Sequence, residues 1–428
     1  MTKSSLLCFI TLSILCQSCN NTTQTHLLQK FDDFGDALTH AIINYKNDVV
    51  KHISHKFNNF EYNPNQDTTI IVSDDAVIEN DDLSFNNTAT VHNNRLINIV
   101  AVGDIMMGSF FPNTNFLPPN DGRDSFKYVK PHLKGDVVFG NLEGALLDNG
   151  NSTKCLGTPA IDPKTDQPKP IKCHAFGMPT RYGKIIKDAG FNVLSLANNH
   201  IGDFGDVGRI STKNTLADVG IYYAGLTSKP TTTFVKNGVK YGMVAFSPNI
   251  GTLSINDLET AKHYVKELDK KVDIVIVSFH GGAEGANHVR VPKTTEMYLD
   301  ENRGNVYEFS HSLIDVGADI VIGHGPHVTR AVEVYKDRFI AYSLGNFNTY
   351  GAFNIRGLSG IAPIINVSMQ TDGKFVLADV VSVYQTKEQG VMVDKDNRAF
   401  GELKRLTQLD FPDSGLIFYN NKITHSSK

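Results

Sequence analysis

The chain has 428 residues, of which 41% are apolar and 20% are charged, and its formal net charge at pH 7 is −4. This length and apolar content suffice for a large core and correspond to two or three ordinary domains. The slightly acidic balance, without a cluster of lysines and arginines, argues against a nucleic-acid partner. Beyond the N-terminus, no stretch reaches the roughly 18 apolar residues of a membrane span.

Residues 1–19 have the features of a signal peptide. Lys3 precedes an apolar run that is too short to span a membrane but is typical of a signal sequence. Ser18 and Cys19 follow, and this arrangement resembles a bacterial lipoprotein signal, in which the cysteine is lipidated. Because Cys16 stands where such signals usually have leucine, cleavage without lipidation or retention as an anchor are the alternatives. In each case the body of the protein lies outside the cytoplasm, where disulfides persist.

Residues 20–94 divide into two parts. Apolar residues recur at helical spacing over residues 26–57, which predicts one amphipathic helix or two. Residues 58–94 are rich in Asn, Thr and Asp and lack periodicity, which predicts a flexible spacer. Such a spacer would hold the body away from a membrane to which Cys19 is anchored.

From residue 95 onward, short apolar strands alternate with helices. Strands are predicted at residues 96–102, 137–139, 193–196, 241–249, 274–279, 321–323 and 339–348, and helices at residues 181–189, 210–219, 255–268 and 306–316. This alternation predicts a predominantly parallel α/β core, with the strand ends at one edge and the later strands as additions to a second sheet. A hairpin that turns at Asp372 and Gly373, and a short helix at residues 399–406, are expected near the C-terminus.

Most of these strands end in polar residues. Ligands of α/β proteins usually bind at the carboxyl ends of the strands. The residues in question are Asp104, Asn141, Glu143, Asn199, His200, His280, Glu284, His324, His327 and Asn346. Each has a simpler explanation alone, such as a helix cap, an Asx turn or a surface histidine. Together, their oxygen and nitrogen donors without sulfur predict a site for Mn, Fe or Zn rather than Ca.

Cys155 and Cys173 are the only cysteines after residue 19, and they flank a proline-rich insertion. A bridge between them would close a loop of roughly twenty residues and stabilise the fold by about 3 kcal/mol in the chain-entropy model. Two free thiols are the alternative, since pairing cannot be read from the sequence.

The polar strand ends belong to a series of motifs that occur in the order GDIMMG, GNLEG, LANNH, HGGAE, GHGPH and SLGNF. This series resembles the signature of the CapA/PgsA-type capsule proteins, which are associated with poly-γ-glutamate synthesis and export and belong to the calcineurin-like metallophosphoesterase superfamily. The resemblance implies a four-layer α-β-β-α sandwich. It places the conserved domain at residues 95–370, with residues 371–428 as a C-terminal strand and tail packed on the core.

The resemblance also implies roles for individual residues. Asp104 and His327 would hold a first metal, Glu143 would bridge, and Asn199, His280 and His324 would hold a second metal, while His200 would protonate a leaving group. Apart from the resemblance, Asn141, Glu284 and Asn346 are candidates for contact with substrate, and a solvated loop acid is the alternative for Glu284. Met106 departs from the pattern because the superfamily usually has histidine there. Glu143 replaces a bridging aspartate, and the last histidine pair is spaced HxxH instead of HxH. The first metal site is therefore expected to be weaker, mononuclear or empty.

Two functions follow from this resemblance. One is a lipid-anchored hydrolase of the cell envelope that uses one or two Mn, Fe or Zn ions to cleave a phosphoester or polymer linkage. The other is a non-catalytic accessory subunit that binds the anionic capsule polymer, its precursor, or membrane synthase and export subunits.

Overall fold

The computed structural model describes residues 95–152, 154–155, 173–351 and 353–426. The predicted signal peptide, the lipidated Cys19, the helical segment at 26–57 and the spacer at 58–94 lie outside these ranges. Within the described ranges, no helix is both long enough and apolar enough to cross a membrane.

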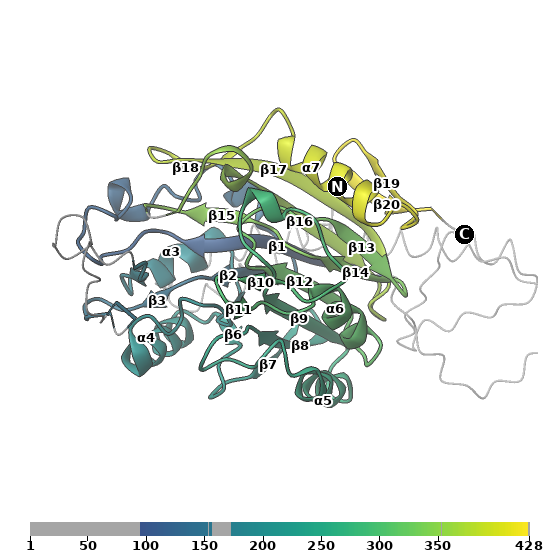
Figure 1. The fold of residues 1–428 in the computed structure, drawn as a ribbon, viewed down its shortest axis with the longest axis horizontal. Coiled ribbons are helices and arrows are strands. Elements are labelled where there is room, and N and C mark those ends of the chain that lie inside the picture. Colours follow the sequence, from purple (N-terminus) through teal and green to yellow (C-terminus); the bar gives the residue numbers. More distant parts are fainter. Residues whose placement is uncertain (1–94, 153, 156–172, 352, 427–428) are drawn as a thin grey trace, which may run out of the picture. The chain divides into compact units, whose positions relative to one another are not determined.

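Two sheets form the centre of the fold (Figure 1). The first has ten strands, which are β1 (Ile97–Met106), β2 (Val137–Leu142), β5 (Val193–Ser195), β6 (Tyr222–Ala224), β15 (Asn346–Thr349), β16 (Ile361–Met369), β17 (Phe375–Thr386), β18 (Gly390–Val393), β19 (Leu416–Tyr419) and β20 (Lys422–His425). The second has six strands, which are β7 (Thr231–Lys236), β8 (Val239–Phe246), β9 (Ile274–His280), β12 (Ile320–His324), β13 (Val332–Tyr335) and β14 (Arg338–Ala341).

Shorter elements complete the described chain. The helices are α3 (Tyr182–Ala189), α4 (Gly205–Asp218), α5 (Leu258–Asp269), α6 (Val306–Ile314) and α7 (Arg398–Asp410). Two small ribbons pair β3 (Ala145–Leu146) with β4 (Gly177–Met178) and β10 (Met297–Tyr298) with β11 (Glu301–Asn302). Single 3-10 turns lie at Pro119–Gly122, Lys130–His132, Ala286–His288 and Gly357–Gly360.

Both sheets combine parallel strands with antiparallel ones. In the first, β15, β1, β2, β5 and β6 pair in parallel, and β16 adds to β1 in the antiparallel sense. In the second, β8, β9, β12 and β14 are parallel, while β7 and β13 are antiparallel. The predicted parallel core is therefore confirmed, and the carboxyl ends of its strands meet at one edge of each sheet.

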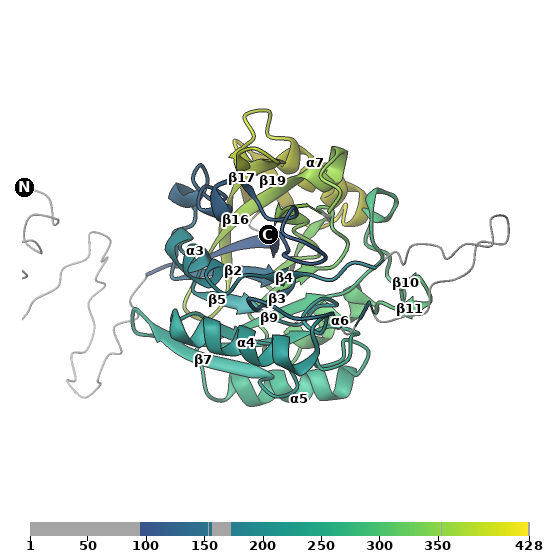
Figure 2. The same cartoon turned by 90° about the vertical axis from the view of Figure 1, so that its left-hand side faces the viewer.

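Side-chain alternation along the strands explains the layers. In β1, Ile97 and Ile99 contact the second sheet, while Val100 and Val102 face α3 and the loops outside the first sheet. β9 behaves in the same way, since its side chains alternate between the space between the sheets and the helices α5 and α6. Strands buried on both faces read as continuous apolar runs. The four-layer α-β-β-α sandwich is confirmed, with β17 and α7 at the top and α5 at the bottom in Figures 1 and 2.

Two sequence-based predictions about the strands were wrong. The single strand predicted at residues 339–348 is two strands, because β14 belongs to the second sheet and β15 pairs with β1 in the first. The chain crosses between the sheets at residues 342–345. The later strands were expected in the second sheet, but β16, β17, β19 and β20 extend the first sheet, since β1 offers its free edge to β16.

The hairpin and the C-terminal helix were predicted in the right places. β16 and β17 pair across a turn that contains Asp372 and Gly373, and α7 covers the predicted residues 399–406 and extends beyond them at both ends. The C-terminal residues thus belong to the same sheet as β1, while the boundary placed at residue 370 stays a prediction.

Candidate metal centre

The strand register brings the polar strand ends together. Asp104 on β1 lies beside Asn141 of β2 and Asn346 of β15, and His324 on β12 lies beside His280 of β9. A close approach fixes the contact between β1 and the crossing segment: a Cβ atom on Gly103 would lie 1.9 Å from the carbonyl oxygen of Gly345. The two sheets therefore present their carboxyl ends to one another at the same place.

A buried group of ligand atoms forms at this place. One ligand atom each from Asp104, Glu143 and His280 lies within 4.8 Å of the others, and all three side chains are inaccessible to solvent. His324 is also buried, and its Nδ1 lies 3.3 Å from Oδ1 of Asp104, without the geometry of a hydrogen bond. His327 follows in the turn after β12. The predicted metal residues from β1, β2, β9 and β12 thus converge.

Asp104 and His327 form an ion pair with two asparagines around it. Nδ1 of His327 lies 3.0 Å from Oδ2 of Asp104 and 3.1 Å from Oδ1 of Asn346. Nδ2 of Asn141 donates to Oδ1 of Asp104 at 2.9 Å. We call these four residues, Asp104, Asn141, His327 and Asn346, the paired set. Both oxygens of Asp104 and Nδ1 of His327 thus have partners within the chain.

The two asparagines of the paired set were expected to contact substrate. Oδ1 of Asn141 accepts from Asn198 at 3.1 Å, and Nδ2 of Asn346 donates to the carbonyl of Ser359 at 3.1 Å. Both side chains are buried. Because their amides already have partners on both sides, the structure favours a positioning role for them over contact with substrate.

The other predicted ligands have no such partners. Both carboxylate oxygens of Glu143, both ring nitrogens of His280 and His324, and Oδ1 of Asn199 are buried and lack a hydrogen-bond partner among the described residues. We call Glu143, Asn199, His280 and His324 the open set. Buried polar groups are normally hydrogen-bonded, and leaving one unpaired costs about 1–3 kcal/mol. Imidazole nitrogens with carboxylate and amide oxygens are a donor set that fits Mn, Fe or Zn.

Burial and nearby charges control the protonation of the centre. Burial alone would raise the pKa of Asp104, but the adjacent imidazoles of His324 and His327 hold it well below its ordinary value. Burial alone would lower the pKa of His327, but the carboxylates of Glu143 and Asp104 raise it to about 10. Burial raises the pKa of Glu143 and lowers that of His280, in each case well away from the ordinary value. In the metal-free chain, these pKa shifts favour the charged forms of Asp104 and His327 and the neutral forms of Glu143 and His280.

His200 lies at the rim of the open set beside an aspartate for which the sequence analysis proposed no role. Nδ1 of His200 is 2.7 Å from Oδ2 of Asp203, and Nε2 is 4.0 Å from Oε1 of Glu143. Burial lowers the pKa of His200 to about 4, although Asp203 opposes this shift. Because Nδ1 of His200 is hydrogen-bonded to Asp203, Nε2 is the ring nitrogen that faces Glu143. The spacing of three residues between His200 and Asp203 was the available signal, but aspartate in a loop is too common to interpret.

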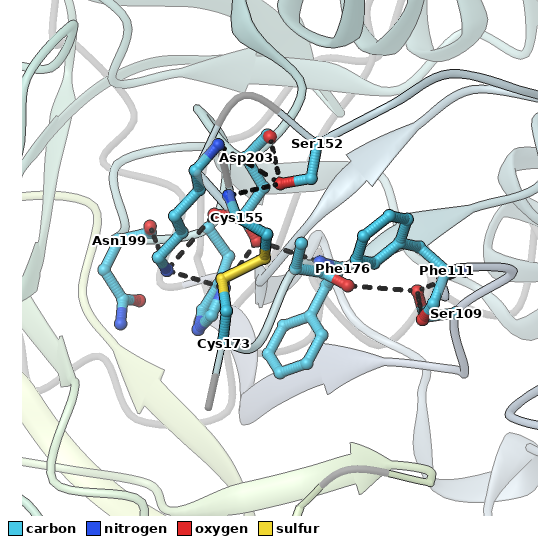
Figure 3. Close-up of a disulfide and its surroundings, with 11 residues drawn as sticks. Ser109, Phe111, Ser152, Cys155, Cys173, Phe176, Asn199 and Asp203 are labelled. Atoms are coloured by element: carbon cyan, nitrogen blue, oxygen red, sulfur yellow. Dashed lines mark hydrogen bonds and ion pairs between the residues drawn. A yellow bond between two sulfur atoms is a disulfide. The ribbon is translucent and has the colours of Figure 1, made fainter. Parts of the chain in front are cut away.

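A disulfide closes the loop beside this pair of residues (Figure 3). Cys155 and Cys173 are bonded, with Cα atoms 5.6 Å apart. Nζ of Lys154 lies 3.2 Å from Oδ1 of Asp203 and 3.4 Å from Nδ1 of His200. The bond thus fixes a lysine next to the buried histidine, a contact that no sequence motif indicated.

Glu284 lies between His327 and a buried arginine, Arg303, for which the sequence indicated no role. Arg303, almost fully buried, lies 3.2 Å from Oε1 of Glu284 and donates to Glu301 at 2.9 Å. Oε2 of Glu284 is 4.0 Å from Nε2 of His327. Glu284 is partly exposed, and of the three residues predicted to contact substrate it is the one that solvent can reach.

Met106 lies two residues after Asp104 on β1, at the position where the resemblance predicts a missing metal ligand. Its side chain is buried, and its sulfur accepts a hydrogen bond from the amide of Gly108 at 3.3 Å. A thioether is a poor ligand for a hard divalent cation.

The motif series and its geometry lead to one family. A profile described as "Bacterial capsule synthesis protein PGA_cap" matches residues 98–350. The chain belongs to the PGA_cap family. The match begins at β1 and ends just after β15, so it contains every residue of the paired and open sets.

Relatives within the PGA_cap family include two named capsule proteins. The chain is 32% identical over 278 residues to the capsule biosynthesis protein CapA of Bacillus anthracis, which covers 59% of this chain and 60% of that protein. It is 30% identical over 264 residues to the PGA biosynthesis protein CapA of Bacillus subtilis, covering 58% and 61%. The chain therefore spans about three fifths of the length of these curated relatives.

Among solved structures, a 5'-nucleotidase precursor from Thermus thermophilus is similar over 74% of this chain and 59% of its own, with 13% identity and a TM-score of 0.38. A likeness at this score assigns no activity to the PGA_cap protein described here.

Proposed function

We propose that this protein is a metal-dependent hydrolase of the cell envelope that acts in capsule polymer synthesis. The observation that carries the proposal is the group of buried ligand atoms from Asp104, Glu143 and His280, with His324 beside His280, because the atoms of Glu143, His280 and His324 lack hydrogen-bond partners among the described residues. A divalent cation is the ligand that would satisfy such donors. Membership of the PGA_cap family supports the process.

The residues of the open set would hold the cation. Glu143, His280 and His324 supply a carboxylate and two imidazoles, and Asn199 adds an amide oxygen. When bound, a Mn, Fe or Zn ion supplies a water of lowered pKa and polarises the bond to be cleaved. Because strand ends carry most of these donors, their positions are set by the sheets rather than by mobile loops.

His200 would move the proton. Its ring is neutral at neutral pH because burial lowers its pKa to about 4. Since Nδ1 donates to Asp203, Nε2 is the atom that would take a proton from the attacking water and then give it to the leaving group. Asp203 stabilises the ring while it carries both protons. This order of events assigns His200 the leaving-group role expected from the sequence and adds a positioning role for Asp203.

The charges around the centre favour an anionic substrate. Lys154 lies beside His200, and the cationic His327 lies 3.5 Å from Glu143. Glu284 is the remaining candidate for contact with substrate. We propose a phosphoester or a linkage of the anionic capsule polymer or its precursor as the substrate, and membrane synthase or export subunits as partners. Lipidation at Cys19 would keep the protein at the membrane.

The proposal is tested with the purified full chain. Metal content is measured by elemental analysis, and turnover is measured on phosphoesters and γ-glutamyl polymers with Mn, Fe or Zn added. We expect His324→Ala to lose both metal and turnover. His200→Ala should keep the metal and lose about 10²–10⁴-fold in rate, as is typical for removal of a general acid or base. His263→Ala, on the exposed face of α5, is the control and should change neither quantity.

A second function is favoured by the loss of a ligand at Met106, which leaves the paired set without a full metal shell. On that account the protein is an accessory subunit that binds polymer or synthase. Bound metal without turnover on any of these substrates, together with polymer binding that His324→Ala leaves unchanged, would support the accessory function and contradict the hydrolase.

A further inference from the structure

The predicted ligands divide into the paired and the open sets, and this division determines how many ions the centre can hold. We propose that the chain binds one divalent ion, in the open set, and that the hydrogen-bonded contact between Asp104 and His327 takes the place of a second ion. This inference refines the metal site on which the proposed function rests.

The open set has enough free donors for one ion. Glu143, His280 and His324 are fully or almost fully buried, and their ligand atoms have no hydrogen-bond partner among the described residues. Asn199 adds a buried amide oxygen in the same condition. Three protein ligands are the usual number at a catalytic zinc site, with a further position left for water or substrate. The open set meets this number without any rearrangement of hydrogen bonds.

In the paired set, both oxygens of Asp104 and Nδ1 of His327 already have partners. Both oxygens of Asp104 have partners, since Oδ1 accepts from Asn141 at 2.9 Å and Oδ2 contacts Nδ1 of His327 at 3.0 Å. Nδ1 of His327 also meets Oδ1 of Asn346 at 3.1 Å. A metal ion here would have to displace a buried ion pair together with the hydrogen bonds around it.

Met106 does not provide the additional ligand that a second ion would need. Its sulfur is engaged with the amide of Gly108 and offers little to a hard cation. Without a nitrogen donor at this position, a second ion would find only Asp104, His327 and a share of Glu143. Distance alone also groups Asp104 with Glu143 and His280. The existing partners of Asp104 are the reason to place it outside the coordination of the single ion.

The stoichiometry of binding tests the inference. The full chain is stripped with a chelator and titrated with Mn²⁺ or Zn²⁺, by calorimetry and by elemental analysis after gel filtration. We expect one ion per chain, and the electron paramagnetic resonance spectrum of the Mn²⁺ form should be that of an isolated ion. Two ions per chain, or a spectrum of two exchange-coupled Mn²⁺ ions, would overturn the inference, as would the absence of binding.

Two matched histidine variants separate the sets. His280→Gln should weaken metal binding strongly. The loss should exceed the factor of about 10–100 that is typical when the removed residue only orients a metal ligand. His327→Gln should retain one ion with an unchanged spectrum. Loss of the ion from His327→Gln would show that the paired set coordinates metal and would contradict the inference. Circular dichroism and thermal unfolding of both variants identify a misfolded protein before binding is compared.

These outcomes are distinct from the test of the hydrolase. One ion without turnover supports the single-ion site and contradicts the proposed function. Two ions with turnover would contradict the single-ion site and support the proposed function.

Discussion

The paired set and the open set lie side by side at the ends of the same strands, yet they treat buried polar atoms in opposite ways. Asp104 and His327 meet at 3.0 Å, and asparagines complete their hydrogen bonds. Glu143 and His280 are equally buried and have no hydrogen-bond partner in the described chain. The difference teaches that burial alone does not identify a binding site. The informative feature is several buried polar atoms without partners at one place, because single atoms of this kind, such as the hydroxyl of Tyr241, also occur elsewhere in the fold.

Removal of Asp104 should give the largest change in stability. Asp104→Ala leaves the buried His327 without its carboxylate and should lower the free energy of unfolding of the chelator-treated protein by about 3–5 kcal/mol. Urea unfolding measures the change. Asp206→Ala is the control, since its exposed ion pair with Arg209 should contribute less than about 1 kcal/mol. If the free energy of unfolding falls by the same small amount in both variants, the paired set does not stabilise the fold.

The pH dependence of stability should separate the two sets next. The folded pKa of His327 is about 10, above its ordinary value of 6.5, so its contribution is complete below pH 6.5 and is lost as the pH rises from 6.5 to about 10. The loss should reach about 2–4 kcal/mol in the metal-free protein. Burial lowers the pKa of His280, so its contribution is present above pH 6.5 and is lost as the pH falls below that value.

The pH prediction is measured as the difference between the native chain and His327→Gln, by urea unfolding between pH 6.5 and 10 with a chelator present. The variant should lack most of the alkaline decline. If the free energy of unfolding declines equally in both proteins, other groups cause the decline, and His327 is not charged beside Asp104 as proposed.

A change in the open set should have the opposite sign and a smaller size. Glu143→Leu replaces an unpaired buried carboxyl group by an apolar side chain of similar volume, and it should stabilise the metal-free chain by about 1–3 kcal/mol while abolishing metal binding. Thermal unfolding with and without Mn²⁺ measures both effects. A variant that is clearly less stable than the metal-free native chain would show that Glu143 is not strained by its burial.

Sequence patterns predicted the fold where each strand could be recognised locally. The continuous apolar run of β9 and the turn at Asp372 and Gly373 were sufficient for their elements. The crossing between β14 and β15 was missed because apolar residues recur from Phe339 to Phe347, and only the tertiary pairing with β1 divides the segment. β16 joins the first sheet because one edge of β1 is free to pair with it. The local sequence of β16 contains no information about that edge.

For the candidate site, the sequence supplied the donors but not their partners. Strand-end motifs located Asp104, Glu143, His280 and His324, because parallel strands bring their carboxyl ends together. The division into two sets could not be predicted, since it depends on distances between segments far apart in the chain. Asp203 and Arg303 were missed for the same reason: single charged residues in loops become informative only once their neighbours are known.

The parallel pairing of β1 with β15 has a consequence for how the protein is made. These two strands stand near opposite ends of the region that matches the family profile, so their contact closes almost the whole domain into one loop. Contacts of such long sequence separation form slowly, because the entropy of closing the loop is lost before the contact stabilises anything. A growing chain that has not yet synthesised β15 lacks Asn346 and the edge that positions Asp104. The centre is therefore a late product of folding, and shortened chains that end before residue 346 cannot assemble it.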